Sequence, residues 1–455
     1  MYAKKVIAIL LFAAVLLGAC APTTPVSTEV SNAPAQPAQP TQAEQPAEAP
    51  EQPTEEAKPV VVSVWVTDAP AVRKAAEEYE KLTGKKVIVE EIAREVLQEK
   101  EKTELTSKTG AYDLLWVPSE WVAELAEGQL LEPLNPYMEN SSLPQPDQAD
   151  WASPGAVEAY NYKGNLYGFP VALDTVFLYY RTDLIEKAPE TWDEYLQVAK
   201  EQTNDQRYGA TLFGKLPESI AWDFINYFWS FGGEILDENF RPTVNSPEGV
   251  ASLTYFTDLL NKEQVVSPGV STYEYPEVLA AFQQDKAAMV LQWNAAYADF
   301  GNPEASPAIY DKFNATVLPG KQMEDGTINR KVIGHVWGFV MNASSQNKEE
   351  AYSFLVYLTG KEGLKYFPTD GASINVNSKA VLSDPAMIEA HPEFELLNES
   401  FQYLQLWPTT TATSQIILTI AQEASSALVG SKTPQQAMDD ANKAIDDLMQ
   451  QAGYY

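Results

Sequence analysis

Short apolar runs alternate with amphipathic segments from residue 60 onward. The β-branched run at 60–66 predicts a buried strand, and the segments at 87–89 and 113–117 predict two more. Helical patterns occupy 71–82 and 96–108 between them. A strand–helix–strand–helix–strand order predicts a parallel, doubly wound sheet, in which ligands bind beyond the carboxyl ends of the strands.

The longest apolar and aromatic run covers 166–180 and follows a Gly-Asn turn signal, so it predicts a buried strand. Pro170 cannot donate to a sheet ladder, and we expect the strand to break or change sheets there. Asp174 is a carboxylate inside this run, where an unpaired charge is costly. Two interpretations stay open: Asp174 caps a turn at a strand end, or it lines a pocket for a polar ligand.

Capping signals mark several helix starts. Asp68 predicts the N-cap of the first helix, and Thr191 with Glu194 predicts a capping box. Thr-Pro opens an amphipathic helix at 433–449. We also expect a short strand at 208–213.

The first twenty residues have the pattern of a secretory leader. Two lysines precede a short apolar run, and Leu17-Gly18-Ala19-Cys20 follows it. These four residues resemble the bacterial lipobox, which implies a signal peptide at 1–19, cleavage before Cys20 and lipid attached to that cysteine. The alternative is an ordinary signal peptide with an incidental cysteine. Residues 20–59 are rich in Pro, Ala, Gln, Thr and Glu and predict a disordered, extended tether.

Composition excludes several classes of protein. The 455 residues carry a formal net charge of −32, which argues against nucleic acid and against electrostatic docking on anionic lipid. Cys20 is the sole cysteine, so no internal disulfide and no cysteine-based zinc site can form. The two histidines, His335 and His391, are far apart in sequence, and we expect no metal site and no cofactor. A lone histidine near a turn, such as His335, is more often structural than a ligand contact.

Aromatic and acidic residues stand together at predicted strand ends. Glu120 and Trp121 follow the third strand, and Trp293 ends a strand at 287–293. Trp222 leads an aromatic helix that runs to residue 231. Trp65 ends the first strand, but we interpret it as a core residue.

Several motifs occur in one collinear order over about 60–450. They are Gly-Asn-Leu-Tyr-Gly-Phe-Pro (164–170), Asp174, Leu-Tyr-Tyr-Arg-Thr-Asp-Leu (178–184), Pro189 with Thr-Trp-Asp-Glu-Tyr (191–195), the segment Tyr-Asp-Leu-Leu-Trp-Val-Pro-Ser-Glu-Trp (112–121), the glycine-flanked run at 336–342, and Gly-Ala-Ser-Ile-Asn-Val-Asn (371–377). In this order the chain resembles the family 1 extracellular solute-binding proteins, the sugar-capturing subunits of bacterial ABC importers.

The resemblance implies an α/β fold of the two-lobed periplasmic-binding-protein type (type II-like). Each lobe is then a sheet flanked by helices, and hinge crossings join the lobes. We expect an N-lobe of 60–172 plus 340–376 and a C-lobe of 173–339 plus 377–455. The 371–377 segment is expected to be the last passage between the lobes.

The resemblance also implies a function and a site. A lipid-anchored protein on the extracytoplasmic face of the cell membrane would capture a sugar or oligosaccharide between its lobes, as a monomer, and deliver it to an ABC transporter permease. It would have no catalytic residue. Strand-end placement and family register together give the expected ligand-binding residues, which are Glu120, Trp121, Asp174, Trp222, Trp293 and Trp337.

Two other functions stay open. The same fold can bind a polyamine, a cationic peptide or another amine, because acidic and aromatic side chains form amine sites through ion pairs and cation–π contacts. A surface glycoside hydrolase would need two carboxyl groups, which Glu120 and Asp174 could supply. The nucleophile-elbow, zinc-protease and phosphate-loop motifs of other hydrolases do not occur in the sequence.

Overall fold

The computed structural model describes residues 58–371 and 373–455, apart from the side chains of residues 94 and 95. The predicted signal peptide, Cys20 and nearly all of the tether lie outside this part of the chain, so the lipoprotein remains a prediction. Within the described residues, no helix is both long enough and apolar enough to cross a membrane.

The first three strands form the predicted parallel arrangement. Strand β1 (Val60–Trp65) pairs in parallel with β2 (Val87–Ile92) and with β3 (Leu114–Pro118). Helices α1 (Ala69–Thr83) and α2 (Arg94–Ser107) connect them. The predicted order of these five elements is confirmed. The carboxyl ends of β1 and β3, where Trp65 and Glu120 lie, therefore meet at one edge of the sheet.

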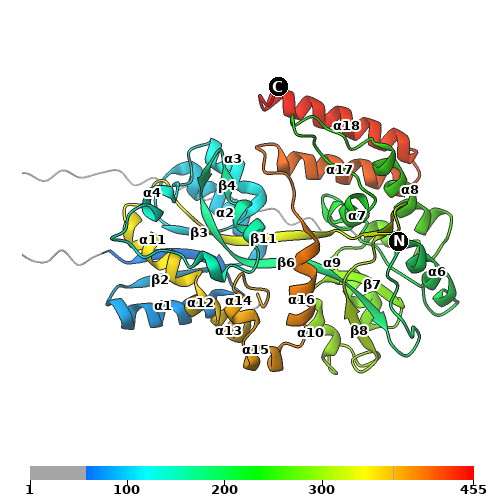
Figure 1. Ribbon diagram of the computed structural model, residues 1–455, viewed down its shortest axis with the longest axis horizontal. Coiled ribbons are helices and arrows are strands. Elements are labelled where there is room, and N and C mark those ends of the chain that lie inside the picture. The colour runs from blue at the N-terminus through cyan, green and yellow to red at the C-terminus, as the bar shows by residue number, and fades with distance from the viewer. Residues whose placement is uncertain (1–57, 372) are drawn as a thin grey trace, which may run out of the picture. The chain divides into compact units, whose positions relative to one another are not determined.

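Two long strands extend this sheet. Strand β11 (Val332–Met341) pairs antiparallel with both β3 and β6 (Gly168–Arg181). Strand β6 also pairs with β7 (Met289–Trp293) and β8 (Phe313–Thr316). The result is one eight-stranded sheet, in which six strands follow the order β2-β1-β3-β11-β6-β7. The other two lie off this path, where β8 pairs with β6 and β12 (Leu404–Gln405) pairs with β11. Figure 1 shows β6 and β11 running from the side that holds β1–β3 to the side that holds β7 and β8.

The prediction of a break at Pro170 is wrong, because β6 continues through it. Pro170 lies opposite Gly338, and the register shifts beside it: Trp337 and Gly338 are consecutive in β11, whereas their partners Ala172 and Pro170 are separated by Val171, so β6 carries one extra residue here. A Cβ atom on Gly338 would lie 2.3 Å from the backbone oxygen of Phe169, so only glycine permits this close approach. Asp174 consequently lies inside a strand, and its interpretation as a turn cap at a strand end is also wrong.

Helices surround the sheet in two groups. Helix α1 lies against α11, α12 and α13, while α7, α8, α17 and α18 pack together (Figure 1). The helices that follow α2 along the chain are α3 (Val122–Glu127), α4 (Asn135–Met138), α5 (Pro154–Glu158), α6 (Trp192–Gln202), α7 (Ser219–Ser230), α8 (Pro247–Asn261), α9 (Tyr275–Gln283), α10 (Ala296–Gly301), α11 (Lys348–Leu358), α12 (Lys361–Leu364), α13 (Tyr366–Asp370), α14 (Lys379–Leu382), α15 (Pro385–Ala390), α16 (Phe394–Ser400), α17 (Thr413–Leu428) and α18 (Pro434–Gln451).

The shorter elements are the 3-10 turns η1 (Ser119–Trp121), η2 (Gln148–Asp150), η3 (Val270–Thr272) and η4 (Phe401–Tyr403), and the strands β4 (Asn161–Tyr162), β5 (Asn165–Leu166), β9 (Lys321–Gln322), β10 (Ile328–Asn329) and β12 (Leu404–Gln405). The capping box at Thr191 is confirmed, and so is the helix that begins after Thr433. The strand expected at 208–213 is absent from the described fold, where Tyr208 forms only an isolated bridge.

Two apolar cores hold the fold. The first gathers around β1, β3 and α1 and includes Trp116 and Phe339. The second gathers around α6, α7 and α17 and includes Trp192 and Phe224. Strand β6 contributes Phe177 to the first core and neighbouring residues to the second, so it ties the two together.

Asp68 begins α1 as predicted, but its carboxylate does not cap the helix. Instead it accepts hydrogen bonds from the backbone N–H and the hydroxyl of Ser373, at 2.9 and 3.1 Å. The chain then runs beside β6, where Asn375 accepts a backbone bond from Leu173 at 2.9 Å and Val376 bridges to Ala172. The predicted last passage is thus fixed at one end to α1 and at the other to β6.

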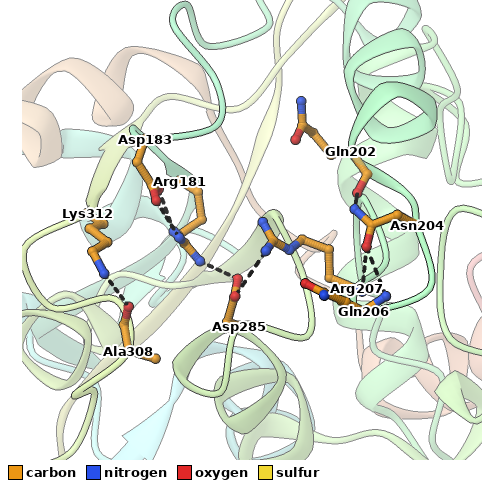
Figure 2. Close-up of polar contacts among 9 residues, drawn as sticks. All are labelled: Arg181, Asp183, Gln202, Asn204, Gln206, Arg207, Asp285, Ala308 and Lys312. Carbon is orange, nitrogen blue, oxygen red and sulfur yellow. Dashed lines mark hydrogen bonds and ion pairs between the residues drawn. The ribbon is translucent and has the colours of Figure 1, made fainter.

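An ion-pair network around the buried Arg181 closes the far end of β6 (Figure 2). Arg181 is 4% exposed and binds both oxygens of Asp183, at 2.7 and 2.6 Å. It also pairs with Asp285, which accepts a second bond from Arg207 at 3.1 Å. Asp285 has a left-handed backbone (φ 57°), a conformation that Asp and Asn tolerate better than most residues. The network joins β6 to the turn before β7.

Candidate functional site

His335 lies at the centre of the expected ligand-binding residues. It stands on β11 directly opposite Asp174 on β6. Trp337 is two residues further along β11, and a strand places residues i and i+2 on one face. The His335 and Trp337 rings are accordingly 5.1 Å apart. Two antiparallel strands thus bring a carboxylate, an imidazole and an indole together.

Tryptophans from the parallel strands surround Trp337. Its ring centroid lies 4.3 Å from Trp65, 6.1 Å from Trp116 and 6.4 Å from Trp121. Trp116 is fully buried and stacks on Trp337 at 10°, so it forms the base of the cluster. Trp65 and Trp121 are half-buried. Trp65 therefore belongs to this cluster as well as to the core.

A second set of tryptophans approaches His335 from α7 and β7. Trp222 begins the second turn of α7, with its ring 4.7 Å from His335. Trp293 ends β7, 5.9 Å from His335 and 6.0 Å from Trp222. Both rings are half-buried. The ring of Trp407 packs edge to face against that of Trp222, with the two centroids 5.7 Å apart.

Glu120 is a buried carboxyl group beside His335. Its side chain is 6% exposed, and its Oε2 atom lies 3.6 Å from His335 Nε2. Burial raises the pKa of Glu120 to about 8, and the charges of Glu218 and Asp174 add smaller upward contributions against a backbone hydrogen bond that lowers it. The turn η1 that carries Glu120 lies against α17. Glu120 is therefore largely neutral at pH 7.

Asn375 orients Asp174. Its side-chain amide donates to Asp174 Oδ1 at 2.7 Å, and Asn375 itself is 1% exposed. The buried amide comes from the last passage, whose backbone is fixed to β6. A half-buried carboxylate held in this way can accept hydrogen bonds in one defined direction.

The structure thus places five of the six expected residues beside His335, and the sixth, Trp121, joins the cluster through its contact with Trp337. Whether they bind a ligand stays a prediction, because geometry alone does not test it. Two surface cavities, of about 440 and 360 Å³, lie elsewhere, along α2 and along α8. Across the described part of the chain, no group of three or more His, Cys, Asp or Glu side chains is arranged to hold a metal ion.

Five members of this cluster were not among the expected site residues, and they are His335, Asn375, Trp407, Trp65 and Trp116. His335 carries no periodic signal, and Asp174, its neighbour across the sheet, is distant in sequence. Asn375 and Trp407 lie outside regular elements, where residue spacing predicts no direction. Trp65 showed the only available signal, an aromatic residue at the carboxyl end of a parallel strand.

Partly exposed indole faces beside carboxyl groups suit two kinds of ligand. The faces of a sugar or polyol carry C–H groups, and its rim carries hydroxyls that bond to carboxyl oxygens. An amine would use the same rings through cation–π contacts.

Comparison with known proteins identifies the family. A family model described as bacterial extracellular solute-binding protein matches residues 65–365, which is more than half of the chain. A probable amino-acid ABC transporter periplasmic-binding protein of Sinorhizobium fredii is 24% identical over 77% of this chain and 80% of its own length.

Solved structures agree with this match. Maltose-bound MalE3 of T. maritima has a TM-score of 0.72 and 26% identity, covering 86% of this chain and 99% of that one. An ABC transporter solute-binding protein of Agrobacterium radiobacter K84 in complex with ribitol has a TM-score of 0.71 and 26% identity, covering 86% and 100%. The predicted two-lobed α/β fold is confirmed. On this match of sequence and fold, the chain belongs to the family 1 bacterial extracellular solute-binding proteins.

Proposed function

We propose that this chain captures a sugar, oligosaccharide or polyol between its lobes and delivers it to an ABC transporter permease. The observation that carries the proposal is the cluster around His335, where half-buried tryptophans stand beside Glu120 and Asp174. Relatives described as binding maltose and ribitol support the ligand class. The proposed role includes no catalytic step.

Each chemical part of the ligand has a counterpart in the site. Trp222 and Trp293 offer ring faces to the C–H surfaces of a sugar. Asp174, oriented by Asn375, accepts hydrogen bonds from hydroxyl groups. Such residues fix a small polar ligand through a few directed contacts on an apolar floor.

We propose that the lobes comprise 60–172 plus 340–376 and 173–339 plus 377–455. Glu120 and Trp121 then come from the first lobe, and Trp222 and Trp293 from the second. Strands β6 and β11 pass between them, so rotation about these strands would open and close the site. A closed, ligand-filled form is what a permease would recognise.

We further propose that the protein is a lipid-anchored monomer on the extracytoplasmic face. The support is the sequence Leu17-Gly18-Ala19-Cys20. Growth of producing cells with labelled palmitate should label the wild-type chain in the membrane fraction. Cys20→Ser should lose both label and membrane association, and equal labelling of this variant would reject the anchor.

An amine ligand is the second candidate. The observation in its favour is the acidic character of the site, where Asp174 and Glu218 both act on Glu120. The Sinorhizobium relative, named as a probable amino-acid binding protein, is consistent with it.

A thermal-shift screen of the purified chain tests the proposal. Maltose, maltotriose, ribitol, sorbitol, spermidine and amino acids form the panel. A ligand at 100 times its dissociation constant stabilises the folded state by about 2.7 kcal/mol, which is a readily measured shift. Shifts with amines alone would favour the second candidate over the first.

Variants then test the location. Trp293→Ala and Asp174→Asn should weaken binding of the stabilising ligand by about ten-fold each, the loss of one good contact. Trp151→Ala is the matched control, because this half-buried tryptophan contacts Phe169 rather than the cluster around His335. Unchanged affinity in both site variants would place the site elsewhere.

A further inference from the structure

Trp293 projects from the end of an edge strand. Val176 and Trp293 form the last pair of the β6–β7 ladder, and β7 is the last strand in the sheet order. Side chains alternate between the two faces of a strand, so Trp293 lies on the same face as Val176 and Asp174. His335 stands opposite Asp174 on this face. The indole thus reaches the cluster around His335 from the point where β7 stops.

An asparagine side chain continues the ladder past this point. Thr175 and Asn294 exchange two hydrogen bonds, as the bonded pairs of an antiparallel ladder do. Asn294 N–H donates to Thr175 O at 2.8 Å, but Thr175 N–H donates to Asn294 Oδ1 at 3.0 Å, where a regular ladder would use the backbone carbonyl. That carbonyl accepts instead from Tyr297 N–H at 3.1 Å, in the first turn of α10. Asn294, which is 1% exposed, therefore lets the chain turn into α10 while it still holds β6.

Two more buried side chains hold the backbone of Trp293. The pair that contains Trp293 precedes this bonded pair and is a non-bonded one, so the N–H and C=O of Trp293 point away from β6. Gln292 Oε1 accepts from the Trp293 N–H at 3.0 Å. The Tyr179 hydroxyl lies 3.2 Å from the carbonyl oxygens of both Trp293 and Asn294 and donates to them. Both polar groups of the Trp293 backbone are therefore fixed by side chains, and Gln292 and Tyr179 are fully buried.

We call these three side chains (Tyr179, Gln292 and Asn294) the β7 brace. Strand alternation places Gln292 and Asn294 on the face opposite to the indole, and it places Tyr179 on that same face of β6. The Tyr179 ring packs there at 4.8 Å from Phe300. Buried groups behind the sheet cannot touch a ligand on its other face. An effect of the brace on binding must therefore pass through Trp293.

Ring contacts alone would hold the Trp293 indole loosely. Its centroid lies 5.9 Å from His335 and 6.0 Å from Trp222, and its side chain is half-buried. The rotamer that a side chain adopts depends on its backbone angles. The brace fixes those angles at the last residue of β7, so it sets the direction in which the indole projects.

We propose that Asn294 is a positioning residue that, with Tyr179 and Gln292, directs the Trp293 indole toward the ligand. The inference rests on the proposed function, because it concerns the ring that would meet the C–H face of a sugar or polyol. Asp174 is oriented separately by Asn375, so the effect of Asn294 falls on Trp293.

The direction of the indole can be measured without a ligand. The full chain labelled with 5-fluorotryptophan has ten fluorine NMR signals, one for each tryptophan, and Trp293→Phe identifies the signal of residue 293. Asn294→Ala removes the acceptor for Thr175 N–H. Tyr179→Phe removes only a hydroxyl and keeps the packed ring. We expect each variant to move, split or broaden the Trp293 signal, because the indole gains other orientations.

Tyr352→Phe is the matched control for these spectra. The Tyr352 hydroxyl is also buried, in the first apolar core, but it makes no hydrogen bond in the described structure. This variant should keep the Trp293 signal of the wild type. A role in stability alone would lower the free energy of unfolding and leave the Trp293 signal of the folded chain in place. An unchanged Trp293 signal in both Asn294→Ala and Tyr179→Phe overturns the inference.

Binding tests the consequence for the ligand. Titration calorimetry with maltose, maltotriose, ribitol and sorbitol compares the wild type with Asn294→Ala, Trp293→Ala and the double variant. Asn294→Ala alone should weaken binding of a probe by about five-fold. In the Trp293→Ala background the same change should alter affinity by less than about two-fold, because Asn294 acts through the indole. If Asn294→Ala does not fold, Tyr179→Phe takes its place in both backgrounds.

The outcomes separate this inference from the proposed function. Equal losses from Asn294→Ala with and without the indole would overturn the inference and leave the function standing. Unchanged affinity in Trp293→Ala would overturn both the proposed location of the site and the inference. Binding of no probe by the wild type would count against the proposed function, and the fluorine spectra would then decide the inference.

Discussion

Glu101 makes the folded chain sensitive to pH from a position behind the site. It lies on α2 and is fully buried, and its Oε1 accepts bonds from Ser63 Oγ at 2.7 Å and from the backbone N–H of Trp116 at 3.1 Å. Its Oε2 is buried without a hydrogen bond in the described structure. Burial raises the pKa of Glu101 from 4.5 to about 8, against the lowering effect of these bonds.

The sign and size of the effect follow from linkage. The unfolded chain ionises Glu101 near pH 4.5, whereas the folded chain keeps the proton until about pH 8. The protonated carboxyl of Glu101 thus makes its full contribution to the free energy of unfolding below pH 4.5, and this contribution is lost as the pH rises to 8. At about 1.4 kcal/mol per pH unit, the full loss is on the order of 5 kcal/mol.

Glu101→Gln isolates this contribution. Glutamine keeps an acceptor for Ser63 and Trp116 but does not ionise. The free energy of unfolding of Glu101→Gln, relative to that of the wild type, should therefore rise by several kcal/mol between pH 5 and pH 8.5. Urea unfolding at several pH values measures the difference. Other buried acids, such as Asp223 with a pKa raised to about 7 by burial, are common to both proteins and cancel.

Glu99→Gln is the matched control, because Glu99 lies exposed on the same helix. Its pH profile should follow the wild type. A stability difference between Glu101→Gln and wild type that stays constant from pH 5 to pH 8.5 would refute the reasoning.

Two further predictions concern stability and are read from thermal or urea unfolding. Gly338→Ala should destabilise by about 1–3 kcal/mol, because its Cβ would lie 2.3 Å from a backbone oxygen of β6. Gly155→Ala, whose Cβ meets its nearest atom at 3.8 Å, should be close to neutral, and equal effects would contradict the close approach. Asparagine tolerates the left-handed backbone at position 285 as aspartate does, so Asp285→Asn removes only the negative charge that pairs with buried Arg181. It should lower the free energy of unfolding by about 1–2 kcal/mol. Lys187→Ala breaks the exposed ion pair with Glu190 and should change the free energy of unfolding by under about 0.5 kcal/mol. A similar loss in Asp285→Asn and Lys187→Ala would contradict the stabilising role of the Arg181 network.

Much of the fold could be predicted because its signals are local. The β-branched run of β1 and the capping box at Thr191 each need only a few neighbouring residues. The behaviour of Pro170 could not be predicted, since its tolerance depends on Gly338, which pairs with it from a strand far along the chain. Asp68 illustrates the same limit, because its carboxylate accepts a hydrogen bond from Ser373, far along the chain, rather than from the first turn of its own helix.

The candidate site followed a similar division. Strand-end placement and family register together selected Glu120 and Trp293. Strands β3 and β7 run in opposite directions from the two sides of the sheet, so their carboxyl ends point toward each other. The central residue, His335, was discounted because its importance arises from neighbours on η1, α7 and β6, which the sheet assembles only after folding.

The two long strands have a consequence for the rates of ligand binding. In a rotation about an axis through β6 and β11, an atom moves in proportion to its distance from that axis. Asp174 and His335 lie on these strands and would stay nearly in place, whereas Glu120 and Trp293 stand on either side and would travel. The stationary pair would meet the ligand at first encounter, and the travelling pair would arrive on closure. Substitutions in the first pair should then slow association, while those in the second should act on dissociation.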